Sequence, residues 1–387
     1  MRRRSCPRAT SAAGSCIGKP ETLSIRSGSA ARRKRLACAR KQFLVLTDSL
    51  ARQIYFLWRR AIQRIPFTPM SSYTRRDFTK LALAALPVAG LMASVNPLRA
   101  APAKGKPNSK VNGVHIGLNV PYSFGNPSMS GDEVLANCVQ LGLSAVELRA
   151  QPVELFLGAP ANLVGAKNAV AAGGAAQNNA ELLRKWRASA SPERAKEFRR
   201  KYEDAGVFIE VLKLDNIFKI SDAELDYGFA LAKALGARAI SSEISKVDED
   251  MKRVGKFADK HRFMVAYHGH ATTTPAHWEA AFASAKFNGA NVDIGHFVAG
   301  NNVSPAEFIK KHHARISHIH VKDRKKNNGT NMPFGEGDTP IKEILQLIRD
   351  NRWNIQATIE FEYKVPATSD RMTELARAIK YCRDALA

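Results

Sequence analysis

The chain has 387 residues, of which 45% are hydrophobic, and its formal net charge is +24. Such an apolar content can bury the core of one large domain or two medium ones, which excludes a disordered chain and a multi-span membrane protein. The charge is concentrated at the N-terminus: residues 1–69 contain 16 Lys and Arg against two acidic residues, whereas residues 111–387 have a net charge of +4. The composition of residues 111–387 therefore gives no reason to expect a nucleic-acid partner.

Residues 70–101 have the pattern of an export signal. Arg75 and Arg76 precede an uncharged run at 81–95, and the small residues at 100–101 offer a cleavage point. The run has the length of a signal-peptide core and is too short to span a bilayer comfortably. This order resembles the twin-arginine signal. The resemblance implies the twin-arginine export machinery as a partner, a periplasmic or otherwise exported protein, and no stable membrane insertion after cleavage.

The remaining segments divide the chain further. Residues 1–69 fit no part of an export signal, so we expect them to be an over-called start of the reading frame. Residues 102–112 are rich in Pro, Lys, Gly and Asn and are predicted to be a linker. The domain is then expected at 113–387, with an insertion at about 151–190 that is too long for a plain loop. We interpret this insertion as a lid or a substrate-binding segment.

Short β-type runs alternate with amphipathic helical runs throughout residues 113–387. This pattern predicts eight strands, each followed by a helix, which is the count and size of a (β/α)8 TIM barrel. An open doubly wound sheet is disfavoured, because the first strand-to-helix turn lacks a G-x-G-x-x-G motif. The predicted strands are 114–120, 145–149, 207–213, 238–244, 263–268, 290–296, 316–321 and 355–361. The predicted helices are 132–141, 192–205, 222–235, 247–260, 275–286, 305–313, 341–351 and 369–386.

Polar residues stand at the carboxyl ends of the fourth to eighth strands, where buried parallel strands are normally apolar. One buried histidine is usually a hydrogen-bonded core residue, but five consecutive strand ends are hard to explain in this way. Barrel enzymes place catalytic residues at these ends, and carboxylates and imidazoles bind divalent metals. A cation would also offset the cost of burying the charges. The residues are Glu243, His268, His270, Asp293, His296, His318, His320, Glu360 and Glu362.

The runs FMVAYHGH, NVDIGHFVAG, RISHIHVKD, FGEGDTPIKEIL and ATIEFEY resemble the xylose-isomerase-like sugar phosphate isomerase/epimerase superfamily. The resemblance implies a TIM barrel that binds one divalent ion, with manganese expected first and zinc, magnesium or cobalt as alternatives. It implies Asp293, His320 and Glu360 as metal ligands, with Glu360 also serving as acid and base. The substrate contacts that it implies are His296, Lys322 and Arg324.

The fifth strand departs from the family pattern, which has a second glutamate there. Here the strand ends in His268-Gly269-His270, so either histidine is a candidate ligand, and His270 is also a candidate base. Glu243 on the fourth strand is the nearest replacement carboxylate and is a candidate ligand and catalytic residue. Two further candidates for substrate contact are His318, which shares a face with His320, and Glu147 at the end of the second strand.

These residues predict an exported, metal-dependent sugar isomerase or epimerase that works through an enediolate, formed by proton abstraction next to a carbonyl. A 3-keto-glycoside lyase using the same metal site is one alternative. A non-catalytic periplasmic sugar-binding protein is another. The expected partner is a sugar or keto-sugar, and a homo-oligomer remains open. The near-neutral domain and the export signal argue against a multi-zinc DNA-repair nuclease.

Overall fold

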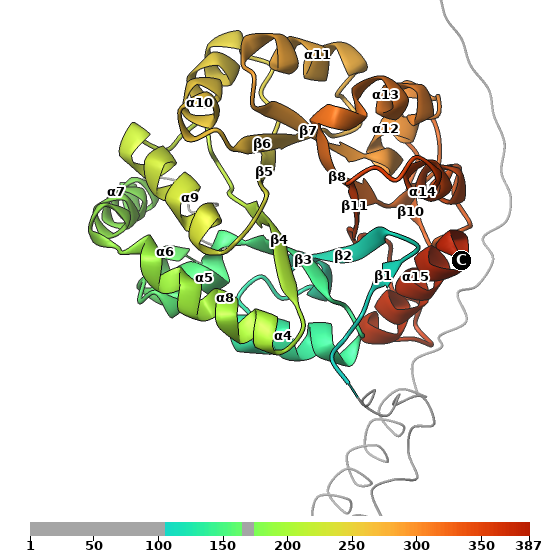
Figure 1. The fold of residues 1–387 in the computed structure, drawn as a ribbon, viewed down its shortest axis with the longest axis horizontal. Coiled ribbons are helices and arrows are strands. Elements are labelled where there is room, and N and C mark those ends of the chain that lie inside the picture. The colour runs from blue at the N-terminus through green and yellow to red at the C-terminus, as the bar shows by residue number, and fades with distance from the viewer. Residues whose placement is uncertain (1–104, 165–173) are drawn as a thin grey trace, which may run out of the picture. The chain divides into compact units, whose positions relative to one another are not determined.

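Eight parallel strands close into a barrel with helices on its outside (Figure 1). Their hydrogen-bonded order is β2-β11-β8-β7-β6-β5-β4-β3, and β2 also pairs with β3, which closes the ring. The predicted (β/α)8 fold is therefore confirmed. A short strand, β1 (Lys110–Val111), pairs antiparallel with β2. The barrel strands are β2 (Val114–Val120), β3 (Ala145–Arg149), β4 (Phe208–Lys213), β5 (Ala239–Glu243), β6 (Met264–His268), β7 (Asn288–Asp293), β8 (Ile316–Val321) and β11 (Gln356–Ile359).

The computed structural model describes residues 105–164 and 174–387. The predicted N-terminal extension, the export signal and the start of the linker lie outside these ranges, as does part of the predicted insertion. Within the described ranges, no helix is both long enough and apolar enough to cross a membrane.

The outer helices begin where the sequence supplies helix caps. Ser130 and Ser221 each form a capping box with a glutamate three residues later, which satisfies two backbone N–H groups at each helix start. A short hairpin follows β8 and consists of β9 (Asp323–Arg324) and β10 (Asn331–Met332). The outer helices are α4 (Gly131–Gln140), α8 (Ala195–Asp204), α9 (Asp222–Ala234), α10 (Asp248–His261), α11 (Pro275–Ser284), α13 (Ala306–His312), α14 (Ile341–Asp350) and α15 (Arg371–Leu386).

The sixth predicted strand ends earlier than expected. Its β-branched residues favoured a strand through His296, but the chain turns into α12 (Ile294–Asn301) directly after Asp293. The Asp293 carboxylate caps this helix, because its Oδ1 accepts a hydrogen bond from the backbone N of His296 at 2.7 Å. Gly295 lets the helix approach β8, since a Cβ there would lie 2.7 Å from the carbonyl oxygen of Lys322.

The predicted insertion contains three helices, α5 (Ala150–Phe156), α6 (Ala161–Val164) and α7 (Gly174–Ser189). In Figure 1 they lie beside α9, on one side of the barrel. Arg187 of α7 fixes this arrangement with two buried ion pairs, 2.8 Å to Glu154 of α5 and 3.1 Å to Glu224 of α9. The insertion is thus attached to the barrel through charged groups shielded from water.

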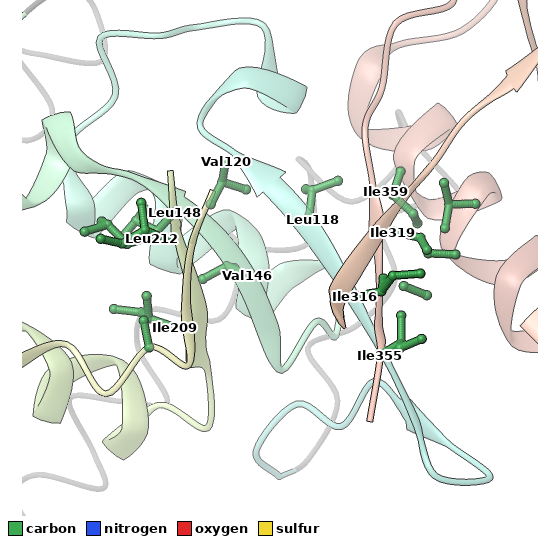
Figure 2. Packing of buried hydrophobic residues seen from close by; sticks show 14 of the residues in the cluster. Leu118, Val120, Val146, Leu148, Ile209, Leu212, Ile316, Ile319, Ile355 and Ile359 are labelled. Carbon is green, nitrogen blue, oxygen red and sulfur yellow. The ribbon is translucent and has the colours of Figure 1, made fainter. Parts of the chain in front are cut away.

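Successive side chains of each barrel strand point alternately to the apolar core outside the barrel and to the barrel interior. Leu118 and Val120 of β2 and Val146 and Leu148 of β3 are fully buried, and they belong to the large apolar core (Figure 2). Each such side chain contributes about 1.5–3 kcal/mol to folding by leaving water. The intervening residues of these and other strands point to the opposite side and include many polar groups, so the barrel interior is polar. These buried polar residues include Asn119, Glu147, Ser241, Asn291, His318, His320, Gln356 and Thr358.

Cys138 of α4 and Cys382 of α15 are both buried, and both thiols are free. Burial raises the pKa of Cys138 to about 12, so this thiol stays protonated and behaves as a small apolar side chain.

Candidate metal centre

Four of the predicted metal-ligand residues meet at the carboxyl ends of neighbouring strands. They are His268 of β6, Asp293 of β7, His320 of β8 and Glu360 after β11, and all four are buried. The strand register brings them together, since His320 lies opposite Asp293 in β7. One potential ligand atom from each lies within 4.8 Å of those of the others. We call these four residues the candidate centre.

The spacing of these atoms suits a shared ion. His320 Nδ1 lies 3.3 Å from Glu360 Oε2 and 3.8 Å from Asp293 Oδ2, and His268 Nε2 lies 3.5 Å from the same Asp293 oxygen. These separations are long for hydrogen bonds, but two atoms bound to one ion at about 2.1 Å lie roughly 3–4 Å apart. His320 Nδ1 is buried and has no hydrogen-bond partner among the described residues. Two imidazoles and two carboxylates therefore fit a divalent ion such as Mn²⁺ or Zn²⁺.

A carboxylate orients the ring of His320. Glu147 Oε2 lies 2.5 Å from His320 Nε2, and neither side chain has exposed surface. Accepting the Nε2 proton leaves the lone pair of Nδ1 directed at the candidate centre. Burial opposes charge on His320, but Glu360 and Glu147 outweigh it and raise the pKa of the imidazole to about 10. The surroundings thus favour positive charge at this position, whether a proton or a metal ion supplies it.

Glu243 likewise orients the ring of His268. Its Oε2 lies 3.0 Å from His268 Nδ1, and its Oε1 accepts a hydrogen bond from the buried Lys213 Nζ at 2.6 Å. Partial desolvation opposes the charge of Glu243, but the ammonium of Lys213 and the two neighbouring histidines outweigh it and lower the pKa of the carboxyl group. Glu243 was also predicted as a metal ligand; it groups with His268 and His270 rather than with the other residues of the candidate centre, and its role as a ligand stays a prediction. The reason for this grouping is the register, which sets Glu243 of β5 beside His268 of β6.

His270 stands at the rim rather than inside the candidate centre. Its side chain is 57% exposed, and its Nε2 lies 2.7 Å from Glu243 Oε2. One carboxylate thus contacts a buried histidine and an exposed one. Of the two histidines, the structure brings only His268 into the candidate centre, and it leaves His270 accessible from solvent.

Lys322 adds a buried positive charge. Its Nζ lies 2.7 Å from Glu360 Oε2, 2.6 Å from Glu362 Oε2 and 3.1 Å from Asp293 Oδ2. Burial opposes the charge, but these three carboxylates raise the pKa of Lys322, which keeps it an ammonium ion. In return, the ammonium lowers the pKa of Glu360 against the effect of burial.

His296 contacts the two other residues that the family resemblance implied as substrate contacts. Lys322 Nζ lies 3.1 Å from its Nε2, and Arg324 Nη1 lies 2.5 Å from its Nδ1. Burial lowers the pKa of His296 to about 4, and nearby positive charge contributes to the shift. The imidazole is therefore neutral at about pH 7, and it can donate or accept one hydrogen bond.

Glu147 lies deeper in the barrel than predicted, beside His318, the deeper of the two histidines of β8. Both have fully buried side chains, and Glu147 Oε1 is 3.6 Å from His318 Nε2. Both residues lie on the Nε2 side of His320, away from the Nδ1 that faces the candidate centre, and their contact with substrate stays a prediction. The second strand was expected to place Glu147 at the rim, but Glu147 is the third of five residues in β3 and points inward.

Two contacts of the site were not anticipated from the sequence. Asn119 Nδ2 donates to Glu360 Oε1 at 2.8 Å, and the hydroxyl of Tyr122 donates to Glu362 Oε1 at 2.7 Å. Asn119 does carry a signal, since it is a polar residue inside the apolar run of the first strand. Tyr122 follows the strand, in a short 3-10 helix (Tyr122–Phe124), and carries no such signal.

A cavity of about 1140 Å³ opens beside the candidate centre. Its walls include residues at the carboxyl ends of β3, β4 and β5 and residues of α6 and α7 in the insertion. Tyr122 and Glu243 line this cavity and also contact Glu362 and His268, so the cavity adjoins the candidate centre. The predicted substrate-binding insertion thus borders a cavity, although its function remains a prediction.

The fold and the buried cluster define a (β/α)8 barrel with a His/Asp/Glu cluster at the carboxyl ends of its strands. This is the position of active sites in barrel enzymes. The family model described as the xylose isomerase-like TIM barrel matches residues 135–385. The chain belongs to this family.

Several solved structures resemble this chain at low sequence identity. D-psicose 3-epimerase from Clostridium cellulolyticum H10 is 12% identical, with 70% of this chain and 99% of that one covered and a TM-score of 0.50. A xylose isomerase domain protein from Planctomyces limnophilus is 14% identical, with 72% and 98% covered and a TM-score of 0.48. The 3-keto-D-glucoside 4-epimerase YcjR from E. coli is 13% identical, with 70% and 100% covered and a TM-score of 0.45. No curated protein matches the chain.

Proposed function

We propose that the protein is an exported, metal-dependent sugar enzyme that removes a proton from carbon next to a carbonyl. The observation that carries this proposal is the spacing of buried nitrogen and oxygen atoms at the candidate centre, 3.3–3.8 Å apart, beside the accessible imidazole of His270. Membership of the xylose isomerase-like family supports a sugar as the substrate.

His268, Asp293, His320 and Glu360 would hold the ion. When bound, a divalent ion polarises the sugar carbonyl and stabilises the negative charge of the enediolate. Glu147 and Glu243 hold the two imidazoles in the orientation that this requires.

The chain's own groups account for proton transfer. Glu243 accepts the Nε2 proton of His270, which leaves Nδ1 of this exposed ring to take a proton from substrate. Lys322 can donate a hydrogen bond to a substrate oxygen, because its ammonium lies at the edge of the candidate centre. Return of the proton to the other face of the carbon is epimerisation, and its return to the neighbouring carbon is isomerisation.

Elimination from a 3-keto-glycoside is the second candidate. The observation in its favour is that the two sides of the site differ, with an imidazole on one side and Lys322 with Glu360 on the other. The base takes the proton from C2, and the electron pair forms the enediolate with C3. The C3 carbonyl then re-forms, a C1–C2 double bond appears, and the C1–O bond breaks. The departing alkoxide takes a proton from an acid such as the Lys322 ammonium.

Deuterium incorporation tests the proposal. The metal-loaded protein is incubated in D2O with 3-keto-sugars and 3-keto-glycosides, and NMR follows the carbon-bound protons next to the carbonyl. We expect deuterium at one such carbon, together with an epimer, an isomer or an unsaturated ketone as product. No incorporation in any of these compounds would refute the proposed reaction.

Two variants separate catalysis from simple binding. His270→Gln should slow exchange by about 10²–10⁴-fold while metal content stays unchanged, because His270 lies outside the candidate centre. Glu360→Gln should reduce both exchange and metal affinity. A sugar-binding protein without activity would show no exchange in any variant and would keep its sugar affinity in His270→Gln.

We also propose export through the twin-arginine route, which rests on the sequence of residues 70–101. Replacing Arg75 and Arg76 by lysine should abolish export, while replacing two lysines in the linker should not. N-terminal sequencing of the exported protein should find a start near residues 101–102. Export of the lysine variant at the normal rate would contradict this proposal.

A further inference from the structure

The cavity beside the candidate centre is larger than a single sugar ring requires. Its volume is about 1140 Å³, and drug-sized ligands usually occupy cavities of about 300–1000 Å³. Its lining is drawn from β2 to β5 and the insertion, whereas the candidate centre is built on β6 to β11. A ring held at the candidate centre would therefore leave the cavity free for another part of the same molecule.

The charges that line the cavity are almost all neutralised by each other. Arg149 pairs with Asp215 at 2.6 Å, and Arg184 pairs with Glu181. The other lining carboxylates are likewise paired, with Arg187 or with Lys213. Lys219 is the one lining cation without an ion pair to any of the residues that the structure describes. A phosphate or carboxylate group is usually bound by several free donors with positive charge, so this lining favours a neutral ligand.

The cavity wall combines apolar and polar surfaces, as a sugar ring does. Leu163, Val164 and Leu183 of the insertion supply apolar surface, and Asn179 and Asn216 supply amide groups. Carbohydrates present C–H faces and hydroxyl edges, and they need both kinds of contact.

The junction between the cavity and the candidate centre is also suited to a sugar. The ring of Tyr122 lies there, 38% exposed, with its hydroxyl fixed on Glu362 and the guanidinium of Arg149 5.2 Å from its centroid. A partly exposed aromatic ring held in one orientation can pack against the C–H face of a sugar without losing much side-chain entropy.

The cavity wall that α7 forms is held in place by buried ion pairs. Arg187 lies between Glu154 and Glu224, and all three side chains are at most 9% exposed. Buried ion pairs are poor sources of stability, because desolvation offsets much of their attraction. They do fix α7 against α5 and α9, which gives the cavity a defined shape before any ligand binds.

We propose that this cavity binds the second sugar unit of a neutral glycoside, such as a disaccharide, whose reacting ring lies at the candidate centre. This inference rests on the proposed function, since it takes the reacting sugar ring to bind at that centre. It narrows the substrate class from sugars in general to glycosides, and it disfavours sugar phosphates.

The experiment measures binding of unreactive sugars to the full chain by saturation-transfer NMR. The probes are sucrose, trehalose, maltose and cellobiose, with glucose and glucose 6-phosphate for comparison. We expect at least one disaccharide to bind through both rings and more tightly than glucose. Failure of every disaccharide to bind, or tighter binding of glucose 6-phosphate than of any disaccharide, would overturn the inference.

Cavity-filling variants test the site, and the same substitution outside the cavity is the matched control. Ala180→Trp on α7 places an indole in the cavity and should weaken disaccharide binding by about tenfold or more, with glucose binding unchanged. Ala188→Trp makes the same substitution on the same helix, at an exposed position outside the cavity lining, and should change neither affinity. Leu183→Trp is a second filling variant, in case the first does not fold. Equal disaccharide affinity in the wild type and in a folded filling variant would overturn the inference.

The outcome is separable from that of the proposed reaction, because binding needs no turnover. A disaccharide that binds in the cavity while no keto-sugar takes up deuterium would refute the reaction and support the cavity site. Exchange on 3-keto-glucose without binding of any disaccharide would support the reaction and refute the cavity site.

Discussion

Replacing Glu147 by glutamine should weaken metal binding without changing any metal ligand. Glu147 contacts His320 Nε2 at 2.5 Å in a position with no exposed surface, so its full negative charge polarises the ring. Glutamine keeps the shape but removes the charge. Loss of such an orienting carboxylate typically costs 10- to 100-fold in metal affinity, which is about 1.4–2.7 kcal/mol. The variant should still fold, because it removes a buried charge and leaves no cavity.

The assay is a competition titration of Mn²⁺ or Zn²⁺ against a chromophoric chelator. Glu374→Gln is the control, because Glu374 is also a buried carboxylate, but on α15, where it accepts a hydrogen bond from Tyr363 at 2.9 Å. The loss should be larger at about pH 9 than at about pH 6. Without the charge of Glu147, the pKa of His320 is lower. At low pH fewer protons therefore compete with the metal ion for this ring, which offsets part of the loss in affinity. Equal metal affinities of wild type and Glu147→Gln at both pH values would refute this account of Glu147.

Three further outcomes are expected. Arg187→Met leaves two buried carboxylates without their cationic partner, so urea unfolding should show a loss of about 3–5 kcal/mol, and a loss below about 1 kcal/mol would contradict the burial of these pairs. Glu210→Gln should cost about 1 kcal/mol at pH 7 and less near pH 3. Hydrogen bonding to His115 and the charge of Arg238 lower the pKa of Glu210, so this stability is fully present above the unfolded-state pKa of about 4.3 and is lost as pH falls through the lower pKa of the folded state. Equal losses at both pH values would contradict that assignment. Removal of bound metal with EDTA should lower the melting temperature, and added Mn²⁺ should restore it; a melting temperature independent of metal would count against a bound ion.

The barrel could be predicted from the sequence because each strand and helix has a strong local pattern. The runs VHIGLNV and HIHV (residues 318–321) alternate apolar outward-facing and polar inward-facing residues, and caps such as Ser221 mark the helix starts. The end of β7 was missed because Ile294 and Val292 favour a strand locally. The Asp293 carboxylate caps α12 and so ends the strand there. This contact can be recognised only once the position of the carboxylate is known.

The candidate site was predictable as a set of strand ends but not as a set of contacts. The period of two correctly placed His318 and His320 on one face. It could not show that Glu147, far away in sequence, crosses the barrel to meet both of them. Likewise, the order of strand ends suggested Glu243 as a ligand, and only the register between β5 and β6 shows that it lies beside His268.

Anomalous X-ray scattering from crystals grown with Mn²⁺ tests the central claim most directly. The account predicts a single peak per chain at the candidate centre, within about 2.0–2.3 Å of His268 Nε2, His320 Nδ1 and a carboxylate oxygen from each of Asp293 and Glu360. His320→Ala crystals should lose this peak. Absence of a peak in the wild type, or a peak coordinated by residues other than these four, would contradict the account.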